Sequence, residues 1–407
     1  MRSNIVILSA LPLLASAAST SGSWGGGVNY SKIFGGGLST NASIHYPGQS
    51  DYNTTTVQRW STWAEPIFAV TIKPATDEDV QYINCQQMNL TFLATSGGHG
   101  GETGFVTVKH AVNIDLSNFK ENVLDLEANA LTVGPGNSFS AFETNPYNAG
   151  KMLSAMWIGA TIGAGIGPYQ GLHGLVIDAL RSVRLVTASG DIVTASDEEN
   201  PDLFWAVRGA GANFGIITSA TQTAGTVRVS ILKRTTSYSD TTLGTTDLFI
   251  CLLDLFRTQE AAQPWINQLL ALNHTQWRNA TLPWSEVSQN SGFGTGASVC
   301  ATGKYNNNPS VGAKQTSASA YIECSTKSKR GVISGRDFSS LMFSKKLRSQ
   351  LVATSGFDSL QTYINYAHGD EGPEVWYGKD NLPKLVQLKR QWDPEGKFGP
   401  GNPIPLA

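Results

Sequence analysis

The chain has 407 residues, of which 41% are hydrophobic, 15% are charged and 42 are glycine. This length exceeds the usual size of one domain, and the apolar content is sufficient for more than one core, so two domains are expected. The formal net charge of −2 argues against nucleic acid or an anionic membrane surface as a partner, because both select strongly basic proteins.

Residues 1–18 have the composition of a secretory signal peptide. Arg2 supplies a positive charge, residues 5–14 are apolar, and Ala15-Ser16-Ala17 is typical of a cleavage site. The apolar stretch is too short to cross a bilayer as a helix. We therefore expect a secreted protein that is not embedded in a membrane. Residues 19–60 are rich in Gly, Ser, Asn and Thr and are expected to form an irregular leader.

Secretion would allow the sequons to be glycosylated and the cysteines to form disulfides. In the chain's six Asn-x-Ser/Thr sequons, glycans are expected at all of the asparagines except Asn89, which directly precedes an apolar strand, namely at Asn29, Asn41, Asn53, Asn273 and Asn279. An oxidising compartment permits disulfides among Cys85, Cys251, Cys300 and Cys324. Three connectivities are open, and proximity favours Cys300 with Cys324. The spacing of Cys and His contains no metal-binding motif.

A first glycine cluster follows a β-α-β pattern. Residues 67–72 predict a strand, Thr76-Asp77-Glu78-Asp79 predicts the start of a helix, and residues 90–94 predict a second strand. The second strand leads into Ser96-Gly97-Gly98-His99-Gly100-Gly101. Glycines let backbone N–H groups crowd against a ligand, and ligands of α/β folds bind at the carboxyl ends of strands. A simple strand-ending turn with an exposed histidine is the alternative interpretation. Further strands are predicted over residues 112–116 and 130–133.

A second glycine cluster contains Gly159, Gly163, Gly165, Gly167, Gly171 and Gly174. Its small side chains would let the backbone approach a bulky planar or phosphorylated ligand. Ile162 and Ile166 make the segment too apolar for a flexible linker, and the glycine spacing is not that of a dinucleotide fingerprint.

A third glycine cluster lies beyond a predicted hairpin. Residues 182–187 and 191–194 flank Ala188-Ser189-Gly190, Asn200-Pro201 starts a short helix with Phe204 and Trp205 facing inward, and Gly209–Gly215 precedes a strand at 216–218. Glycine clusters near strand ends, within one α+β pattern, favour a large phosphate-bearing cofactor.

The rest of the chain is less regular. Residues 247–257 and 264–272 are expected to be helical, and the stretch 286–335 shows little strand signal. A final helix is predicted over residues 382–392.

Five blocks of sequence carry a resemblance to a known family. They are Ser96-Gly97-Gly98-His99, Gln170-Gly171-Leu172-His173-Gly174, the long block from Asn200 to Gly215, Tyr363-Ile364-Asn365-Tyr366 and Trp392-Asp393-Pro394. With them, the chain resembles the secreted FAD-linked oxidases of the berberine-bridge-enzyme-like group, within the vanillyl-alcohol-oxidase and p-cresol-methylhydroxylase (PCMH) superfamily, and especially its fungal branch. The resemblance covers residues 60–221 and 357–407, approximately.

The resemblance implies an α+β fold. A two-subdomain PCMH-type FAD-binding domain is expected over 61–225, a shortened α/β substrate domain over 226–355, and a C-terminal segment, 356–407, that returns to the FAD domain. Relatives carry a longer substrate domain, built on an antiparallel sheet, and residues 286–355 show too few strands to build one. Either that domain is reduced, or the sequence lacks a segment.

The resemblance also implies the cofactor site. His99 occupies the position of the family's histidine that bonds covalently to FAD through the flavin's 8α carbon. Many relatives add a cysteine bonded to the flavin's 6-position, where this chain has Gly159, so a single covalent link is expected. Besides the first cluster, the implied FAD contacts are Thr161, Ile162, Gly163, Gly165, Gly167, Gly171, Gly211, Asn213, Gly215, Ile216 and Asn402.

Tyr366 matches a position that serves as catalytic base in some relatives. A free tyrosine has a pKa of about 10, so it acts as a base at neutral pH only where a cation or hydrogen-bond donors stabilise the phenolate. A tyrosine that merely pairs within a sheet is the alternative. His110 and His173 have no comparable support.

The expected function is oxidation of a small organic molecule, such as a secondary metabolite, with transfer of electrons to O₂. Sugar oxidases of the superfamily often use a doubly attached flavin, so Gly159 argues mildly against a sugar substrate. Two alternatives stay open: a flavoprotein cyclase of secondary metabolism, and a non-catalytic relative with a truncated pocket. Oligomeric state is left open.

Overall fold

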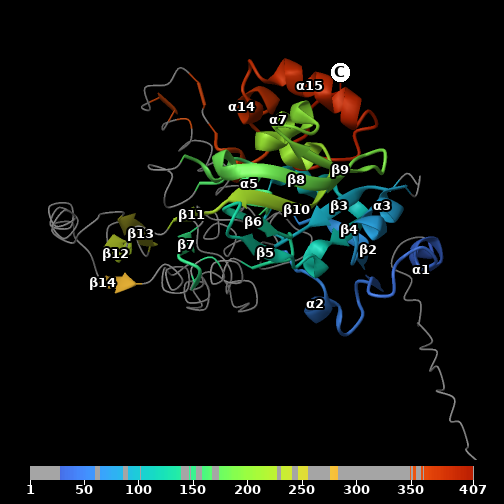
Figure 1. Ribbon diagram of the computed structural model, residues 1–407, viewed down its shortest axis with the longest axis horizontal. Coiled ribbons are helices and arrows are strands. Elements are labelled where there is room, and N and C mark those ends of the chain that lie inside the picture. The colour runs from blue at the N-terminus through green and yellow to red at the C-terminus, as the bar shows by residue number, and fades with distance from the viewer. Residues whose placement is uncertain are drawn as a thin grey trace, which may run out of the picture.

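The computed structural model describes residues 28–59, 65–85, 90–100, 102–138, 146, 148–152, 158–166, 174–226, 231–240, 246–254, 276–282, 349, 352–353, 359–360 and 362–406. Two sheets with their helices form the main body, and helices near the C-terminus lie against one of them (Figure 1).

The first sheet follows the strand order β1-β2-β4-β3. The strands are β1 (Ser43–His45), β2 (Ile67–Lys73), β3 (Phe92–Thr95) and β4 (Lys109–Asp115). β4 pairs in parallel with both β2 and β3, whereas β1 pairs antiparallel to β2. Helix α3 (Asp77–Cys85) crosses over between β2 and β3. The predicted β-α-β unit is therefore present, with its glycine loop at the carboxyl end of β3.

The region expected to be an irregular leader contains regular structure within residues 28–59. Helices α1 (Tyr30–Phe34) and α2 (Tyr52–Thr55) flank β1, which extends the first sheet. Tyr30 and Phe34 are four residues apart, so both lie on one face of α1 and are buried in the core beside the first sheet. That expectation was wrong here, because a few well-spaced apolar residues anchor a segment whose composition is otherwise typical of loops.

The second sheet is antiparallel, with the strand order β5-β6-β10-β8-β9. Its strands are β5 (Asn122–Asp125), β6 (Ala130–Val133), β8 (Leu180–Val186), β9 (Ile192–Ser196) and β10 (Ile216–Thr223). The predicted hairpin is confirmed as β8 and β9, and Gly190 provides the positive φ of 91° in its turn.

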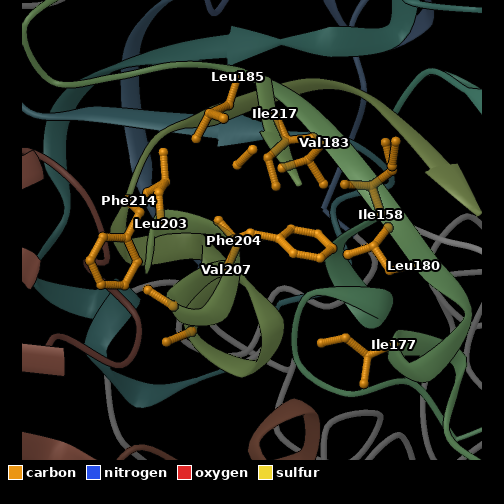
Figure 2. Close-up of a cluster of buried hydrophobic side chains, with 14 of the residues drawn as sticks. Ile158, Ile177, Leu180, Val183, Leu185, Leu203, Phe204, Val207, Phe214 and Ile217 are labelled. Carbon is orange, nitrogen blue, oxygen red and sulfur yellow. The ribbon is translucent and has the colours of Figure 1, made fainter. Parts of the chain in front are cut away.

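Helix α7 (Pro201–Ala210) packs its apolar face on the second sheet. Phe204 is fully buried and points into the cluster that β8 and β10 line with Val183 and Ile217 (Figure 2). Trp205 is half-buried against the same cluster. The C-terminal helix α15 (Leu382–Trp392) has the predicted bounds and adds Leu385 and Leu388 to this core. α14 (Pro373–Tyr377) precedes it.

Shorter elements complete the described chain. They are α5 (Ile158–Thr161), the 3₁₀ turns η1 (Thr103–Thr107), η2 (Leu116–Asn118), η3 (Val176–Ala179), η4 (Gly211–Asn213) and η5 (Ile364–Tyr366), and the paired strands β7 (Lys151–Met152) and β11 (Gly225–Thr226).

A three-stranded antiparallel sheet occupies part of the expected substrate domain. β12 (Ile231–Asp240) lies between β13 (Thr246–Asp254) and β14 (Gln276–Leu282). The helix expected over 247–257 is therefore wrong for residues 247–254. Their continuous apolar run lacks a period that distinguishes a strand from a buried helix, and pairing with β12 decides the outcome. The helix expected over 264–272, the stretch 286–335, Asn273, Cys300 and Cys324 lie outside the described residues.

Asp79 stabilises the start of α3. Its carboxylate, 2% exposed, accepts hydrogen bonds from Ser39 N (2.6 Å), Ser39 Oγ (2.7 Å), Ala75 N (2.8 Å) and Thr76 N (3.1 Å). Burial alone would raise the pKa of Asp79, but these hydrogen bonds outweigh it and hold the pKa below its usual value. The charged form thus stabilises the fold above the unfolded-state pKa of about 3.9, and this stabilisation is lost as the pH falls through the lower folded-state pKa.

Asp79→Asn is therefore expected to lower the free energy of unfolding by about 1–3 kcal/mol at pH 7, with a smaller difference from wild type at pH 3. Urea unfolding at both pH values measures this. Asp197→Asn, at an exposed position, should change little at either pH. Equal losses at pH 7 and pH 3 for Asp79→Asn would contradict the role assigned to its charge.

Candidate functional site

The first glycine cluster is a tight turn held by neighbouring backbone. Ser96 Oγ donates a hydrogen bond to the Pro135 carbonyl at 2.6 Å. Gly98 has a φ of +71°, and a Cβ there would lie only 2.6 Å from the Gln58 carbonyl oxygen. Only glycine suits that position. Gly97 and His99 are exposed at the turn, and Gly101 lies outside the described residues.

The second and third glycine clusters contact each other. Gly209 N donates to the Ile162 carbonyl at 2.9 Å, and a Cβ on Gly211 would lie 2.8 Å from Ile162 Cβ. Gly215 lies against the β8 backbone, where a Cβ would be 2.7 Å from the Val186 carbonyl oxygen, and Ile216 follows it as the first residue of β10. Two segments separated in sequence are therefore in close contact at these glycines.

A left-handed turn closes the second cluster. Ala164 and Gly165 have φ values of +95° and +73°, and their carbonyls accept hydrogen bonds from Ile177 N (3.0 Å) and Val176 N (2.8 Å). Positive φ is unfavourable for alanine by roughly 1–3 kcal/mol and is characteristic of functional turns. Gly167 and Gly171 lie outside the described residues.

The tail, which is the segment from residue 362 to residue 406, bridges the clusters. Asn365 Nδ2 donates to the Ala160 carbonyl at 2.8 Å, and a Cβ on Gly163 would collide with Asn365 Oδ1 at 2.0 Å. Beyond it, Thr103 N donates to the His368 carbonyl at 2.8 Å, close to the first cluster. The tail therefore joins the loop after β3 to the second cluster.

Asn213 joins the same tail to the third cluster. Its buried Nδ2 donates to Tyr377 Oη (2.8 Å) and to the Asn402 carbonyl (3.2 Å), while its Oδ1 accepts from Ile404 N (2.9 Å). Burial raises the pKa of Tyr377 and keeps its hydroxyl neutral. Both amide hydrogens of Asn213 are used within the protein, so this side chain holds the tail in place and has no hydrogen left for a ligand.

Two of the sequence-predicted contact residues carry polar atoms without a protein partner. Thr161 Oγ1 and Asn402 Oδ1 are buried, and neither makes a hydrogen bond within the part of the chain that the structure describes. A buried polar atom left unpaired costs about 1–3 kcal/mol. Each of these two atoms is therefore available for a hydrogen bond to a polar ligand.

The predicted catalytic residue lies at the surface of this tail. The Tyr366 side chain is 79% exposed, and its ring meets the Tyr363 ring edge to face with 5.1 Å between centroids. Tyr363 Oη accepts hydrogen bonds from Ile166 N (3.1 Å) and Asn365 Nδ2 (2.6 Å). Tyr366 Oη makes no hydrogen bond to any described residue. Gly159, where the resemblance led us to expect a cysteine in many relatives, borders open space, since a Cβ there would have no neighbour within 4 Å among the described atoms.

Sequence reasoning missed the residues that connect the clusters. Asn365 and Tyr363 belong to the motif Tyr363-Ile364-Asn365-Tyr366, which was the available signal. The sequence analysis assigned a role only to Tyr366 in it. Arg59, which donates from Nη2 to the Gly100 carbonyl, had no sequence signal because the contact depends on tertiary structure.

Within the described ranges, no helix is long and apolar enough to cross a membrane, and no group of three or more His, Cys, Asp or Glu side chains is placed to hold a metal.

Two family models match the chain. A model of the FAD binding domain matches residues 68–196, and a berberine and berberine-like model matches residues 362–405. These ranges include the first and second glycine clusters and the tail that bridges them.

Curated relatives extend the match to the whole chain. The chain is 71% identical to the FAD-linked oxidoreductase tazL of Aspergillus terreus, with all of both chains covered. It is 34% identical to the FAD-linked oxidoreductase fmqD of Aspergillus fumigatus, over 94% of each. The alignment with tazL runs over 495 positions, more than the 407 residues of this chain, so that relative has residues with no counterpart here.

Solved structures share the fold at low identity. BBE-like 1 of Physcomitrella patens superimposes with a TM-score of 0.70 at 19% identity, over 93% of this chain and 100% of that one. A carbohydrate oxidase of Microdochium nivale gives a TM-score of 0.69 at 19% identity, over 92% and 99%. The α+β, PCMH-type fold expected from the sequence is confirmed.

Proposed function

Because the chain belongs to the berberine-bridge-enzyme-like family of FAD-linked oxidoreductases, we propose that it is a secreted oxidase that transfers hydride from a small secondary metabolite to a covalently held flavin and passes the electrons to O₂. When bound, FAD supplies the redox chemistry. The chain's own residues hold the cofactor, place the substrate and accept a proton.

The observation that carries this proposal is the convergence of the glycine clusters under one tail. Asn365 contacts the second cluster, Asn213 ties the third to Asn402, and the unpaired Thr161 Oγ1 and Asn402 Oδ1 lie at predicted contact positions. Backbone N–H groups of the glycine turns would bind the cofactor's phosphates, and the two unpaired oxygens would take its remaining polar groups. Tyr366, exposed beside Tyr363, is the residue proposed to meet the substrate and take its proton. Its hydroxyl has no hydrogen-bond partner among the described residues, so the bound cofactor or substrate would have to supply the donors that stabilise the phenolate.

His99 is proposed as the residue that holds the flavin. Its imidazole would hold the flavin through a bond to the flavin's 8α carbon, and the flavin, once held, would supply the redox chemistry. His99 is exposed at the turn. Gly159 has no thiol, so we propose this single link.

The test is an absorbance spectrum of the secreted protein before and after acid precipitation. Wild type is expected to keep its yellow colour in the precipitated polypeptide. His99→Ala is expected to release all of its flavin to the supernatant. His110→Ala, a change at an exposed histidine outside the loop, should behave as wild type. Flavin retained by His99→Ala would assign the link elsewhere, and a colourless wild type would favour a non-catalytic relative.

Secretion and glycosylation are part of the same proposal. Asn29, Asn41 and Asn53 are all exposed, and all lie in the N-terminal region around β1. Glycans there would project into solvent without displacing core residues. Enzymatic removal of N-glycans is expected to lower the mass of the secreted protein, and Asn→Gln changes at these positions should remove part of that shift. A secreted protein whose mass does not change would contradict glycosylation.

A further inference from the structure

Arg59 and Gln58 contact the His99 turn on both sides of the histidine. On one side, a Cβ on Gly98 would lie 2.6 Å from the Gln58 carbonyl oxygen and 3.3 Å from Arg59 Cα. On the other side, Arg59 Nη2 donates a hydrogen bond to the Gly100 carbonyl. The one residue between these two contacts is His99.

The Arg59 side chain is itself held in place. Its guanidinium lies over the Phe105 ring, with Cζ 5.0 Å from the ring centroid. A Cβ on Gly100 would meet Phe105 at 2.6 Å and Arg59 Nη2 at 3.1 Å, so the turn, the ring and the guanidinium are in close contact. Phe105 is the buried residue of η1 and packs in a small core with Leu93, Val108 and Ala111. Arg59, which holds the turn, is therefore itself packed against a buried residue of the domain.

This arrangement buries the guanidinium of Arg59, and burial disfavours the charged form of that group. Burial lowers the pKa of Arg59, while the negative charges of Glu102 and Glu65 act in the opposite direction. Arg59 Nε is buried and has no hydrogen-bond partner among the described residues. An apolar side chain would cover Phe105 without these costs, but it would not donate to the Gly100 carbonyl.

We propose that Arg59 is a positioning residue for covalent attachment of the flavin: it fixes the backbone on the C-terminal side of His99 so that the imidazole is held toward the cofactor. The inference rests on the proposed function of His99. Glycines flank this histidine on both sides, and glycine loses more backbone freedom on ordering than any other residue. Bond formation requires the two reacting atoms to be held near contact, so an unanchored turn would react slowly even with FAD bound.

The test compares Arg59→Ala, Arg59→Lys and wild type, all as secreted full-length protein. For each we would measure total flavin per polypeptide and the fraction that stays with the polypeptide after acid precipitation. Arg59→Ala is expected to lower the retained fraction at least tenfold while total bound flavin falls much less. Arg59→Lys, which keeps the charge but loses the planar donor array, should be intermediate. Ethylguanidinium added during incubation of Arg59→Ala with FAD is expected to restore part of the attachment.

Arg181→Ala is the matched control. Arg181 also donates to a backbone carbonyl, that of Ala128 at 2.8 Å, but it lies on β8 at an exposed position. It should retain flavin as wild type does. Should Arg59→Ala fail to fold, Arg59→Lys decides: a wild-type retained fraction in that variant overturns the inference. A wild type that retains no flavin overturns the His99 proposal and this inference together. A wild type that retains flavin, with Arg59→Ala equal to it, overturns this inference alone.

Discussion

Replacing Lys389 by methionine is expected to lower the free energy of unfolding by about 3–5 kcal/mol, the cost of leaving a buried charge without its partner. Lys389 and Asp393 are 1% and 0% exposed, and Lys389 Nζ lies 2.5 Å from Asp393 Oδ2. The ammonium uses its other hydrogens on the Asn213 carbonyl (2.8 Å) and the Phe398 carbonyl (3.0 Å). Methionine has a similar length and removes all three interactions.

The same substitution is expected to weaken cofactor binding, because Lys389 holds the backbone of Asn213 in the third glycine cluster. Urea unfolding measures the stability, and total flavin per polypeptide measures the binding. Lys384→Met is the control: Lys384 is 47% exposed and pairs with Asp202 at 3.3 Å on the surface, where ion pairs contribute about 0–1 kcal/mol. Equal losses of unfolding free energy and of bound flavin in the two variants would show that burial of the Lys389 pair has no special effect.

Tyr366→Phe is expected to lower turnover by about 10²–10⁴-fold, the usual contribution of a positioned proton acceptor. Phenylalanine keeps the edge-to-face contact with the Tyr363 ring, so the flavin spectrum and the retained flavin should be unchanged. The measurement is the rate of flavin reduction and of O₂ uptake, with a substrate found to reduce the wild-type flavin.

The control for this change is a tyrosine hydroxyl that bonds to a segment outside the three glycine clusters. Tyr82 Oη donates to the Ile33 carbonyl at 3.1 Å, beside α1. Tyr82→Phe should keep wild-type turnover. Full turnover in Tyr366→Phe would remove the proton-accepting role, and release of its flavin would assign the residue to cofactor binding.

Local sequence signals predicted local structure well. Residues 67–72, the 182–194 hairpin and helix 382–392 were predictable because each carries a clear period and clear end signals, and β2, β8, β9 and α15 confirm them. Residues 247–254 were assigned wrongly because an apolar run is ambiguous until its partner is known. The sparse apolar residues of the leader were missed because composition hid their spacing.

The site was predictable in its glycines and less so in its connections. Glycine clusters in a sequence indicate directly where the backbone can lie close to a neighbouring group. In contrast, Asn365 with Ala160 and Asn213 with Asn402 are pairs 205 and 189 residues apart, and no local pattern encodes such pairs. Asn213 shows the difference: its contact with the cofactor stays a prediction, whereas no sequence signal indicated that its side chain ties the tail to the third cluster.

The place of the tail in the sequence also sets the order in which the parts of the candidate site are synthesised. A ribosome makes the glycine clusters first, and the residues that join them follow Gly215 by 150 residues or more, since they are Asn365, Tyr377, Lys389 and Asn402. During synthesis, the glycine clusters are therefore present for some time before the tail residues that join them. On the proposed function, the flavin would find its complete site only after the tail has been synthesised, so the order of synthesis would set the earliest point of cofactor binding.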